Sequence, residues 1–379
     1  MTDWPVKTLG EVAVVNPSEP ALSEDAPFVP MDAVTAGKRD VQYTQPRGQR
    51  SGARARAGDI LFARITPCLQ NGKVALVQDE IARCGGSTEF IVVRAGPDVL
   101  NGYLYQWITS DHIRDEVTAL MKGATGRQRL DAEDLALAEL PVPPLEEQKR
   151  IVALLETATS RITELTACYE QARTHANNLF ASALRTALES NPDWSVKTLG
   201  EVATFHNGRA YKQQELLDKG KYRVLRVGNF FSSKSWYWSD LELDEHKYCD
   251  KGDLLYAWSA SFGPRIWGEE KVIYHYHIWK VVEDSQQIDR QFLKYWLEED
   301  VERVKSASGT GTTMMHVSKG NIEARLISLP PLEEQKQIVA RLDSMKAKTS
   351  EMVAAYDAKL TAAKNLRQSI LEAAFAGDL

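Results

Sequence analysis

Three peptides occur twice in this chain, and in the same order. The repeated pairs are WPVKTLGEVA and WSVKTLGEVA from residues 4 and 194, GDILFA and GDLLYA from residues 58 and 252, and PPLEEQK from residues 143 and 330. The copies are offset by 187 to 194 residues, whereas a solenoid built from repeats of roughly 20 to 50 residues would return far more often. The sequence therefore predicts one structural unit of about half the chain, used twice.

Composition places the chain among globular proteins of more than one domain. Its 379 residues are 43% hydrophobic and 26% charged, which is ordinary for a folded, soluble protein. No apolar run approaches the roughly 18 residues of a membrane span, and the N-terminus has no signal-peptide pattern. We therefore expect a cytoplasmic protein. Its four cysteines are widely spaced, which favours reduced thiols over disulfides or a zinc site.

Each copy of PPLEEQK predicts the start of a long helix. Proline suits the first helical position because its missing N–H needs no partner there, and the two glutamates suit the positive end of the helix dipole. No proline or glycine follows until Pro192 in the first copy and Gly377 in the second. The sequence predicts helices within 143–190 and 330–379.

Apolar residues recur alternately four and three apart along both predicted helices, as in a coiled coil. A helix of about 45 residues would be roughly 67 Å long and could not bury this stripe alone. We therefore expect the two helices to pair antiparallel with pseudo-two-fold symmetry; the alternative is two ordinary bundle helices in separate domains. The main residues of the predicted seam are Ile151, Leu155, Ile162, Leu165, Tyr169, Leu179, Ile338, Leu342, Met345, Met352, Tyr356, Leu366 and Ile370.

The remaining segments, 1–142 and 191–329, mix the periodicities of strands and helices. The predicted strands span 59–65, 87–95 and 271–282, and the predicted helices span 101–121 and 289–307. The sequence thus predicts an internally duplicated α/β protein, with two α/β domains joined by two long antiparallel helices. The middles of the two domains differ while the flanking peptides match, which favours one scaffold that presents two different surfaces.

These features resemble a known family. Two variable segments, each ending in PPLEEQKxIV and a long helix, with a C-terminal SILEAAFAGDL, resemble the specificity subunit of a type I restriction-modification system over essentially the whole chain. The resemblance implies a DNA-binding, non-catalytic subunit whose two target-recognition domains each recognise one half of a split double-stranded DNA sequence. It also implies two modification (methyltransferase) subunits that bring S-adenosylmethionine, and restriction subunits that act as translocase and nuclease.

The net charge of -6 argues against a uniformly basic DNA-binding surface, so candidate DNA contacts must be local. In the first domain, RGQRSGARAR forms an arginine-rich, glycine-containing loop that suits phosphate or guanine, and the residues after the strand at 59–65 suit adenine and phosphate. The alternatives are a solvated loop and a plain hairpin connection. The candidates here are Arg47, Arg50, Arg54, Arg56, Arg64, Thr66, Gln70, Asn71 and Lys73.

A glycine-rich loop occupies corresponding positions in both domains, GATGRQRL from residue 123 and SGTGTTMMHV from residue 308. Backbone N–H groups of such loops approach phosphate, and we favour this role over an ordinary loop because the side chains differ between the copies. The candidates on these loops are Arg127, Gln128, Arg129, Thr310, Thr312, Thr313 and His316. The other candidates in the second domain are Asn229, Lys234, Ser259, Ser261 and Arg265.

No motif for catalysis or metal binding is evident in the sequence. His275 and His277 alternate on one predicted strand, but without a third ligand at suitable spacing we expect buried, hydrogen-bonding histidines rather than a metal site. A phosphate-binding GxxxxGK[ST] loop, an adenosylmethionine loop, a GxSxG elbow and an HExxH pair are all missing. We expect the chemistry to belong to partner subunits.

The expected mechanism is positional. Phosphate contacts would register the protein on DNA, a few side chains per domain would contact base edges, and the helix pair would set the gap between half-sites. The alternative is a tandem adaptor that spaces two protein-binding domains and does not bind DNA. The bases recognised depend on loop geometry that no motif in this sequence encodes.

Overall fold

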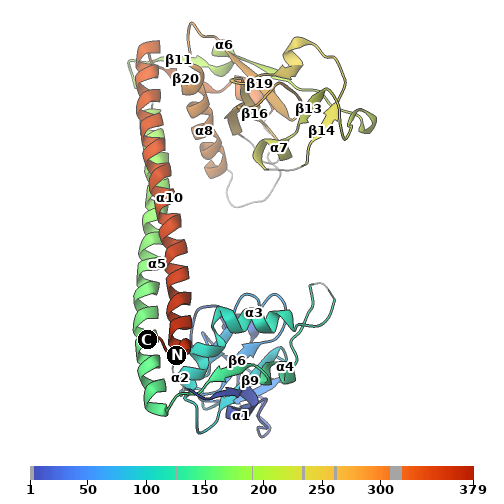
Figure 1. Ribbon diagram of the computed structural model, residues 1–379. Helices are drawn as coiled ribbons and strands as arrows, with labels where there is room; N and C mark the ends of the chain where they lie inside the picture. The colour runs from blue at the N-terminus through green and yellow to red at the C-terminus, as the bar shows by residue number, and fades with distance from the viewer. Residues whose placement is uncertain (1–3, 125, 190, 233–234, 260–262, 308–317) are drawn as a thin grey trace. The chain divides into compact units, whose positions relative to one another are not determined.

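The computed structural model describes residues 4–379 except 125, 190, 233–234, 260–262 and 308–317. The chain forms two compact units (Figure 1). Unit 1 comprises Met1–Gln171 and Tyr356–Leu379, and unit 2 comprises Ala172–Ala355. Each compact unit takes in parts of both long helices, so the units do not coincide with the four predicted segments. The predicted boundaries at residues 142, 190 and 329 stay a prediction. Among the described residues, no helix combines the length and apolar character that a membrane span requires.

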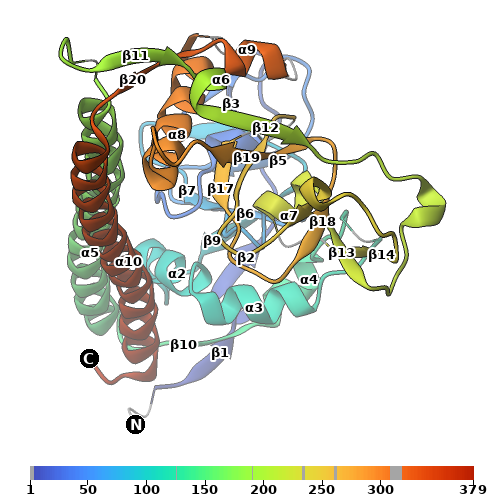
Figure 2. The same ribbon diagram turned by 90° about the horizontal axis from the view of Figure 1, so that it is seen from above.

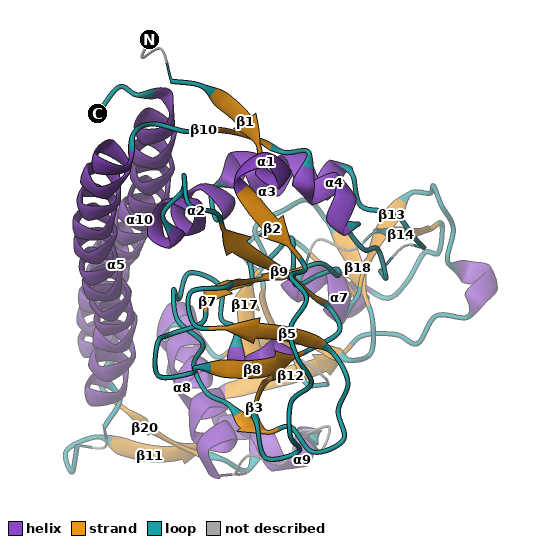
Figure 3. Cartoon of the chain, turned by 90° about the horizontal axis from the view of Figure 1, so that it is seen from below, coloured by secondary structure: helices purple, strands orange, loops and turns teal. Residues whose placement is uncertain are grey.

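The duplication extends to every sheet. Within the described residues, each unit has a two-stranded sheet and two four-stranded sheets, and adding ten to each strand number of unit 1 gives the strand order of unit 2. In unit 1 the sheets are β1 (Val6–Thr8) with β10 (Glu139–Pro141); β2 (Ala13–Val15), β9 (Phe90–Ala95), β6 (Ile60–Ala63) and β7 (Val74–Leu76); and β4 (Gln45–Pro46), β3 (Pro27–Val29), β8 (Arg83–Gly86) and β5 (Ala53–Arg56). Figure 3 shows β3, β8 and β5 side by side.

Unit 2 repeats these three sheets in the same strand order. They are β11 (Ser195–Thr198) with β20 (Leu326–Leu329); β12 (Ala203–Asn207), β19 (Ile278–Glu283), β16 (Leu254–Ala257) and β17 (Gly263–Ile266); and β14 (Tyr237–Ser239), β13 (Tyr222–Leu225), β18 (Val272–Tyr274) and β15 (Tyr248–Cys249). The prediction of an internally duplicated α/β fold is confirmed at the level of strand order.

Helices complete the units (Figure 2). The long helices are α5 (Leu145–Ala187) and α10 (Leu332–Ala376). The shorter α-helices are α1 (Leu9–Val12), α2 (Asn101–Ile108), α3 (Asp111–Ala119), α4 (Ala132–Ala136), α6 (Leu199–Val202), α7 (Val227–Phe231), α8 (Arg290–Ala307) and α9 (Lys319–Glu323). Single 3-10 turns are η1 (Met31–Ala33), η2 (Gln213–Glu215) and η3 (Glu245–Lys247).

Two predicted elements are each divided in the structure. The helix predicted over 101–121 is α2 followed by α3. Thr109 is the C-cap of α2, and Ser110 caps the start of α3, its Oγ accepting a hydrogen bond from the Ile113 N–H at 3.4 Å. The strand predicted over 271–282 is β18 followed by β19, separated by a short turn at 275–277. A continuous apolar pattern concealed both breaks, since the residues on either side are buried.

The repeated TLGE peptide forms the same capping box in both units. The carboxylate of Glu11 accepts hydrogen bonds from the N–H of Thr8 at 2.7 Å and from its hydroxyl at 2.8 Å. Glu201 does the same for Thr198 at 2.6 and 2.8 Å. In each unit, these contacts give the N–H of the N-cap threonine a hydrogen-bond acceptor and so stabilise the start of the first short helix. The recurrence of the peptide follows from this shared role.

The repeated PPLEEQ peptide positions a glutamine inside each unit. Gln148 is fully buried; its Oε1 accepts from the N–H of Leu100 at 2.9 Å, and its Nε2 donates to the carbonyls of Asp98 and Pro143. Gln335 is buried in the same way and makes the equivalent three hydrogen bonds. The peptide therefore starts a helix and also fastens that helix to the α/β part of its unit.

In each unit, one stretch of α5 packs antiparallel to one stretch of α10. Ile151 and Leu155 near the start of α5 share the core of unit 1 with Leu371 and Ala374 near the end of α10. In unit 2, Leu184 and Leu188 at the end of α5 share the core with Ile338 and Leu342 at the start of α10. The predicted antiparallel pairing is confirmed, and the predicted seam residues Ile151, Leu155, Ile338 and Leu342 are buried. Tyr169 contacts Tyr356 with ring centroids 6.4 Å apart.

The predicted seam is shifted by one residue at alternate positions. Leu165, Leu179, Met352 and Leu366 are exposed, so their assignment to a buried seam is wrong. The half-buried positions are instead one residue further on, at Thr166, Phe180, Val353 and Arg367. The prediction took the more hydrophobic of two neighbouring residues at each of these positions. Because the seam includes polar side chains such as Thr166 and Arg367, the predicted alternation of four-residue and three-residue spacings was out of step.

Candidate nucleic-acid interface

One edge of each unit collects loops that are far apart in the sequence. Strands β3 and β8 are parallel neighbours, with Val29 opposite Gly86, and β13 and β18 are parallel with Leu225 opposite Tyr274. The loops that follow parallel neighbours leave the sheet at the same edge. We call residues 30–32, 64–66, 87–89 and 128–129 the first edge, and residues 226–229, 258 and 275–277 the second edge.

At the first edge, backbone hydrogen bonds join residues predicted to contact DNA. The N–H of Arg64 donates to the carbonyl of Glu89 at 2.9 Å. Thr66 and Gln128 bond reciprocally, since the Thr66 N–H donates to the Gln128 carbonyl and the Gln128 N–H donates to the Thr66 hydroxyl, both at 3.0 Å. The structure thus brings the loop after β6 against the glycine-containing loop of residues 123–129.

Charges at the first edge are partly paired. Arg129 forms a two-pronged ion pair with Glu89, with its Nη2 2.7 Å from Oε1, and these hydrogen bonds lower the pKa of Glu89. Arg64 lies 3.5 Å from a carboxylate oxygen of Asp131. The Nε of Arg64 is buried and has no hydrogen-bond partner among the described residues. Arg64 therefore keeps a donor that its neighbours do not satisfy.

Lys73 is also close to the first edge, because its Nζ donates to the carbonyl of Met31 at 3.0 Å. Gln70 and Asn71 are exposed on the turn between β6 and β7 and line a hollow of about 380 Å³. Arg127 is exposed at the side of Gln128. These predicted residues share one hairpin and one adjoining loop.

The arginine-rich segment is more ordered than a solvated loop. Arg47 donates to the carbonyl of Leu22 at 3.2 Å, and Arg50 donates to that of Pro46 at 2.9 Å. Arg54 donates to the carbonyl of Glu19 at 2.7 Å and, like the exposed Arg56, lies on β5 rather than on a loop. Alternation along β5 directs both arginines outward while Ala55 is buried. Carbonyl partners leave the positive charges unneutralised.

At the second edge, eight of the described residues line a hollow of about 340 Å³. They include Arg226, Asn229, Tyr237, His275 and His277. The guanidinium carbon of Arg226 lies 5.2 Å from the ring centroid of Tyr237, and the amide nitrogen of Asn229 donates to the carbonyl of Ser235 at 3.2 Å. The sequence analysis predicted Asn229 as a DNA contact but did not predict Arg226. The one sequence feature that points to Arg226 is its position directly after the apolar end of β13.

The histidines belong to this hollow rather than to the core. His275 and His277 are half-buried, and the Nδ1 of His275 accepts from the His277 N–H at 3.5 Å. Burial lowers the pKa of His275 to about 4, with smaller contributions from His277 and Arg226. A neutral imidazole offers one donor and one acceptor, which suits contact with a base edge. Among the described residues, no three potential metal ligands gather.

The other predictions in unit 2 have different outcomes. Ser259 is buried, which contradicts its predicted role at the surface. It directly follows Trp258, the first residue after β16. Arg265 is exposed and donates to the carbonyl of Phe230 at 2.6 Å, next to the second edge. The predicted residues that lie outside the described residues are Lys234, Ser261, Thr310, Thr312, Thr313 and His316.

The family model of the type I restriction modification DNA specificity domain matches this chain twice, over residues 1–172 and 191–362. The chain belongs to that family. It is 23% identical over 205 residues to the type I restriction enzyme EcoBI specificity subunit of Escherichia coli, which covers 54% of this chain and 43% of that protein. The chain therefore spans less than half the length of the EcoBI subunit.

Other members of this DNA specificity family match more of the chain. The EcoKI specificity subunit of Escherichia coli is 25% identical over 321 residues, covering 76% of this chain and 68% of that protein. A chain solved in work on the complex assembly and conformational transition of the type I restriction-modification system superimposes with a TM-score of 0.86 at 24% identity, covering 99% and 98%. This second likeness shows a shared fold.

Proposed function

We propose that this chain is the specificity subunit of a type I restriction-modification complex, in which each unit recognises one half of a bipartite double-stranded DNA target. One observation carries this proposal. The first residues after three corresponding strands are Pro30, Arg64 and Ser87 in unit 1, and Arg226, Trp258 and His275 in unit 2. Equivalent positions of the two units therefore carry different side chains, so the two units would contact different bases.

The chemistry of the edges suits duplex DNA. Arginine pairs bidentately with guanine in the major groove, asparagine pairs with adenine, and the positive charge along β5 suits phosphate. Arg64 and Arg226 occupy the two edges, and Arg54 and Arg56 are exposed on β5. The half-site sequences follow from these and neighbouring side chains. That the helix pair sets the gap between half-sites stays a prediction.

We further propose that two copies of a methyltransferase subunit dock on this chain, one on each unit. Exposed apolar side chains recur at equivalent positions of the two units. Val6 and Val196, at equivalent positions of the two-stranded sheets, are 61% and 60% exposed. An exposed leucine lies near each of them, Leu137 at 69% and Leu326 at 66%, although these two leucines occupy different positions of the repeat. A surface that repeats while the DNA edges differ suits two copies of one partner.

The helices carry a second repeated surface. Leu165 and Met352 occupy equivalent positions of α5 and α10, as do Leu179 and Leu366, and all four are exposed. In this proposal the methyltransferase subunits bring S-adenosylmethionine and flip out a target base, restriction subunits join them, and this chain contributes recognition without catalysis in the cytoplasm.

The test is methylation mapping. The chain is co-expressed with its methyltransferase partner subunit, and methylated bases are located across the host genome by long-read sequencing. We expect a split motif with a fixed gap that disappears when the chain is omitted. Arg64→Ala should relax one half of the motif and Arg226→Ala the other, because losing a bidentate contact costs about 1–3 kcal/mol of discrimination.

A matched control is Lys251→Ala. Lys251 is exposed and follows β15, which runs antiparallel to β18, so it lies at the opposite edge of the sheet from the second edge. This variant should leave the motif unchanged. Methylation that does not depend on the chain, with an active partner present, would favour the tandem protein-binding adaptor instead.

A further inference from the structure

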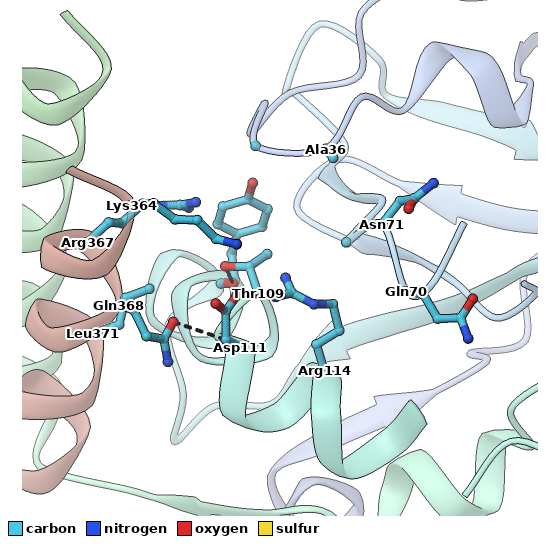
Figure 4. Close-up of a pocket in the computed structure, with 13 residues that line it drawn as sticks. Ala36, Gln70, Asn71, Thr109, Asp111, Arg114, Lys364, Arg367, Gln368 and Leu371 are labelled. Carbon is cyan, nitrogen blue, oxygen red and sulfur yellow. Dashed lines mark hydrogen bonds and ion pairs between the residues drawn. The ribbon is translucent and has the colours of Figure 1, made fainter. Parts of the chain in front are cut away.

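Unit 1 has a hollow of about 380 Å³ between helix α10 and the α/β part of the unit (Figure 4). Lys364, Arg367 and Gln368 project into it from α10, and Asp111 and Arg114 project from α3. The turn that carries Gln70 and Asn71 lies across the opening. All of these elements belong to unit 1.

The hollow is cationic, with three basic side chains facing one carboxylate. That carboxylate, Asp111, is ion-paired with Arg114. Gln368 is held in place because its Oε1 accepts from the N–H of Asp111 at 3.3 Å and its Nε2 donates to Glu372 at 2.9 Å. The Nε of Arg367 is buried and has no hydrogen-bond partner among the described residues. The one carboxylate pairs with Arg114, and among the described residues no ion pair joins Arg367 or Lys364 to a carboxylate.

Unit 2 fills the corresponding space. The helix segments NNLFASALRTA from residue 177 and KNLRQSILEAA from residue 364 align without gaps, so Phe180 corresponds to Arg367. Phe180 packs on Tyr295 with ring centroids 6.2 Å apart and joins the core of unit 2. In unit 2 the Nζ of Lys346 lies over the Phe180 ring at 5.4 Å, so a cation is nearby but the helix position itself is aromatic. The scaffold therefore does not need an arginine at this position, and a buried guanidinium nitrogen without a hydrogen-bond partner costs stability relative to an aromatic side chain.

We propose that a backbone phosphate of the DNA bound by unit 1 occupies this hollow, between Arg114, Lys364 and Arg367. This inference rests on the proposed DNA-binding function. The hairpin from Arg64 to Lys73 connects the two sites, because Thr66 belongs to the first edge and Gln70 to Gly72 line the hollow. A strand of DNA placed along this hairpin would bring a phosphate to the arginines, which bind phosphate with paired donors.

The contact would position DNA without selecting its sequence, since phosphate oxygens are the same at every base pair. Gln368, held between Asp111 and Glu372, would fix the helix position from which Lys364 and Arg367 extend. Unit 1 would thereby gain a register contact that unit 2 lacks.

The test transplants the residues of unit 2 into unit 1. The variant Lys364→Asn, Arg367→Phe, Gln368→Ala carries the side chains that the chain itself uses at the equivalent positions. In the purified complex with the methyltransferase partner subunit, affinity for a target duplex is measured between 50 and 300 mM salt, roughly the range over which phosphate contacts dominate. We expect about tenfold weaker binding near physiological salt, a salt slope reduced by about 0.9, and an unchanged methylated motif.

Lys348→Asn, at an exposed position of α10 that does not line the hollow, is the control for the lost lysine and should change neither quantity. An unchanged affinity and slope for the transplant, in a complex of normal composition and melting temperature, would overturn the phosphate contact and leave the proposed function intact. Weaker assembly with the methyltransferase subunit, with normal DNA binding once assembled, would assign the hollow to a carboxylate of that partner and also overturn it. A wild-type complex without salt-dependent binding would refute the proposed function itself.

Discussion

Unit 1 and unit 2 have the same strand order in all three described sheets. They differ at nearly every side chain of the first edge and the second edge, which follow corresponding strands. The first edge carries arginine and an arginine–glutamate pair, and the second carries arginine, asparagine and two histidines around a hollow. Under the proposed function, separate residues would encode support and DNA recognition. The repeated peptides fix the scaffold, and the loops between them vary independently.

The supports are local and fully bonded, which explains how they tolerate changes around them. Each capping box forms its hydrogen bonds between residues three apart in the sequence. Each buried glutamine, near the start of a long helix, accepts from a backbone N–H of the α/β part of its unit. Neither device depends on the side chains of the edges. Three predictions test how far this equivalence of the two units extends.

The largest expected effect tests whether the supports are equivalent. Gln148→Ala and Gln335→Ala should each lower the free energy of unfolding of their own unit by about 4 kcal/mol, because each removes three hydrogen bonds and leaves buried backbone groups unpaired. Hydrogen–deuterium exchange under increasing denaturant, followed peptide by peptide, measures the two units separately.

Gln171→Ala and Gln337→Ala are matched controls at exposed positions of α5 and α10, and both should be nearly neutral. If one buried glutamine proved costly and the other did not, the two units would differ in their supports despite their identical peptides.

The second prediction concerns a repeated residue with different partners. Asp59 is buried and bonds to two nitrogens of Arg94, each at 2.7 Å, whereas Asp253 makes one ion pair with Lys280 at 2.6 Å. We expect Asp59→Asn to destabilise unit 1 by about 3 kcal/mol, and Asp253→Asn to destabilise unit 2 by about 1 kcal/mol, since its pair is more accessible.

Urea denaturation of the two variants, with the units resolved by exchange, measures this difference. The exposed Asp79→Asn in unit 1 controls for the loss of a carboxylate. Equal losses from Asp59→Asn and Asp253→Asn would mean that the bidentate geometry contributes nothing beyond a simple ion pair.

The sequence predicted the duplicated architecture and the two long helices because repeated local signals specify them. It did not predict the breaks within 101–121 and 271–282. Proline followed by two glutamates marked both long helices, and apolar periodicity identified the antiparallel pair. It was not sufficient for the seam, since Thr166 and Arg367 are half-buried while Leu165 and Leu366 are exposed. Tertiary packing decided these positions against their hydrophobicity.

The candidate interface was partly predictable for the same reason. Arg64, Thr66 and Gln128 stood out as polar residues after a strand and on a glycine loop, and they do lie together. Arg226 did not stand out, and His275 was considered only as a possible metal ligand, because only the parallel pairing of β13 and β18 brings their loops together. Which strands are parallel neighbours is a property of the whole unit and leaves no local pattern.

The smallest expected effect separates the two edges by pH. His275 occupies the position that Ser87 occupies in unit 1, directly after the corresponding strand. Burial lowers the pKa of His275 in the folded protein to about 4, below the value of about 6.5 in an unfolded chain. As pH falls from 6.5 towards 4, the unfolded state binds a proton that the folded state does not, so unit 2 loses stability.

We expect this loss to be on the order of 1 kcal/mol between pH 7 and pH 4.5, since water still reaches part of the ring and reduces the full effect. His275→Gln should remove it while keeping a neutral polar side chain, and His112→Gln, at an exposed position of unit 1, should not. Denaturant midpoints of unit 2 at several pH values measure the difference. A pH dependence that survives in His275→Gln would mean that another group, such as His206, whose pKa is also lowered by burial, causes the sensitivity, and that the histidine at the second edge titrates in contact with solvent.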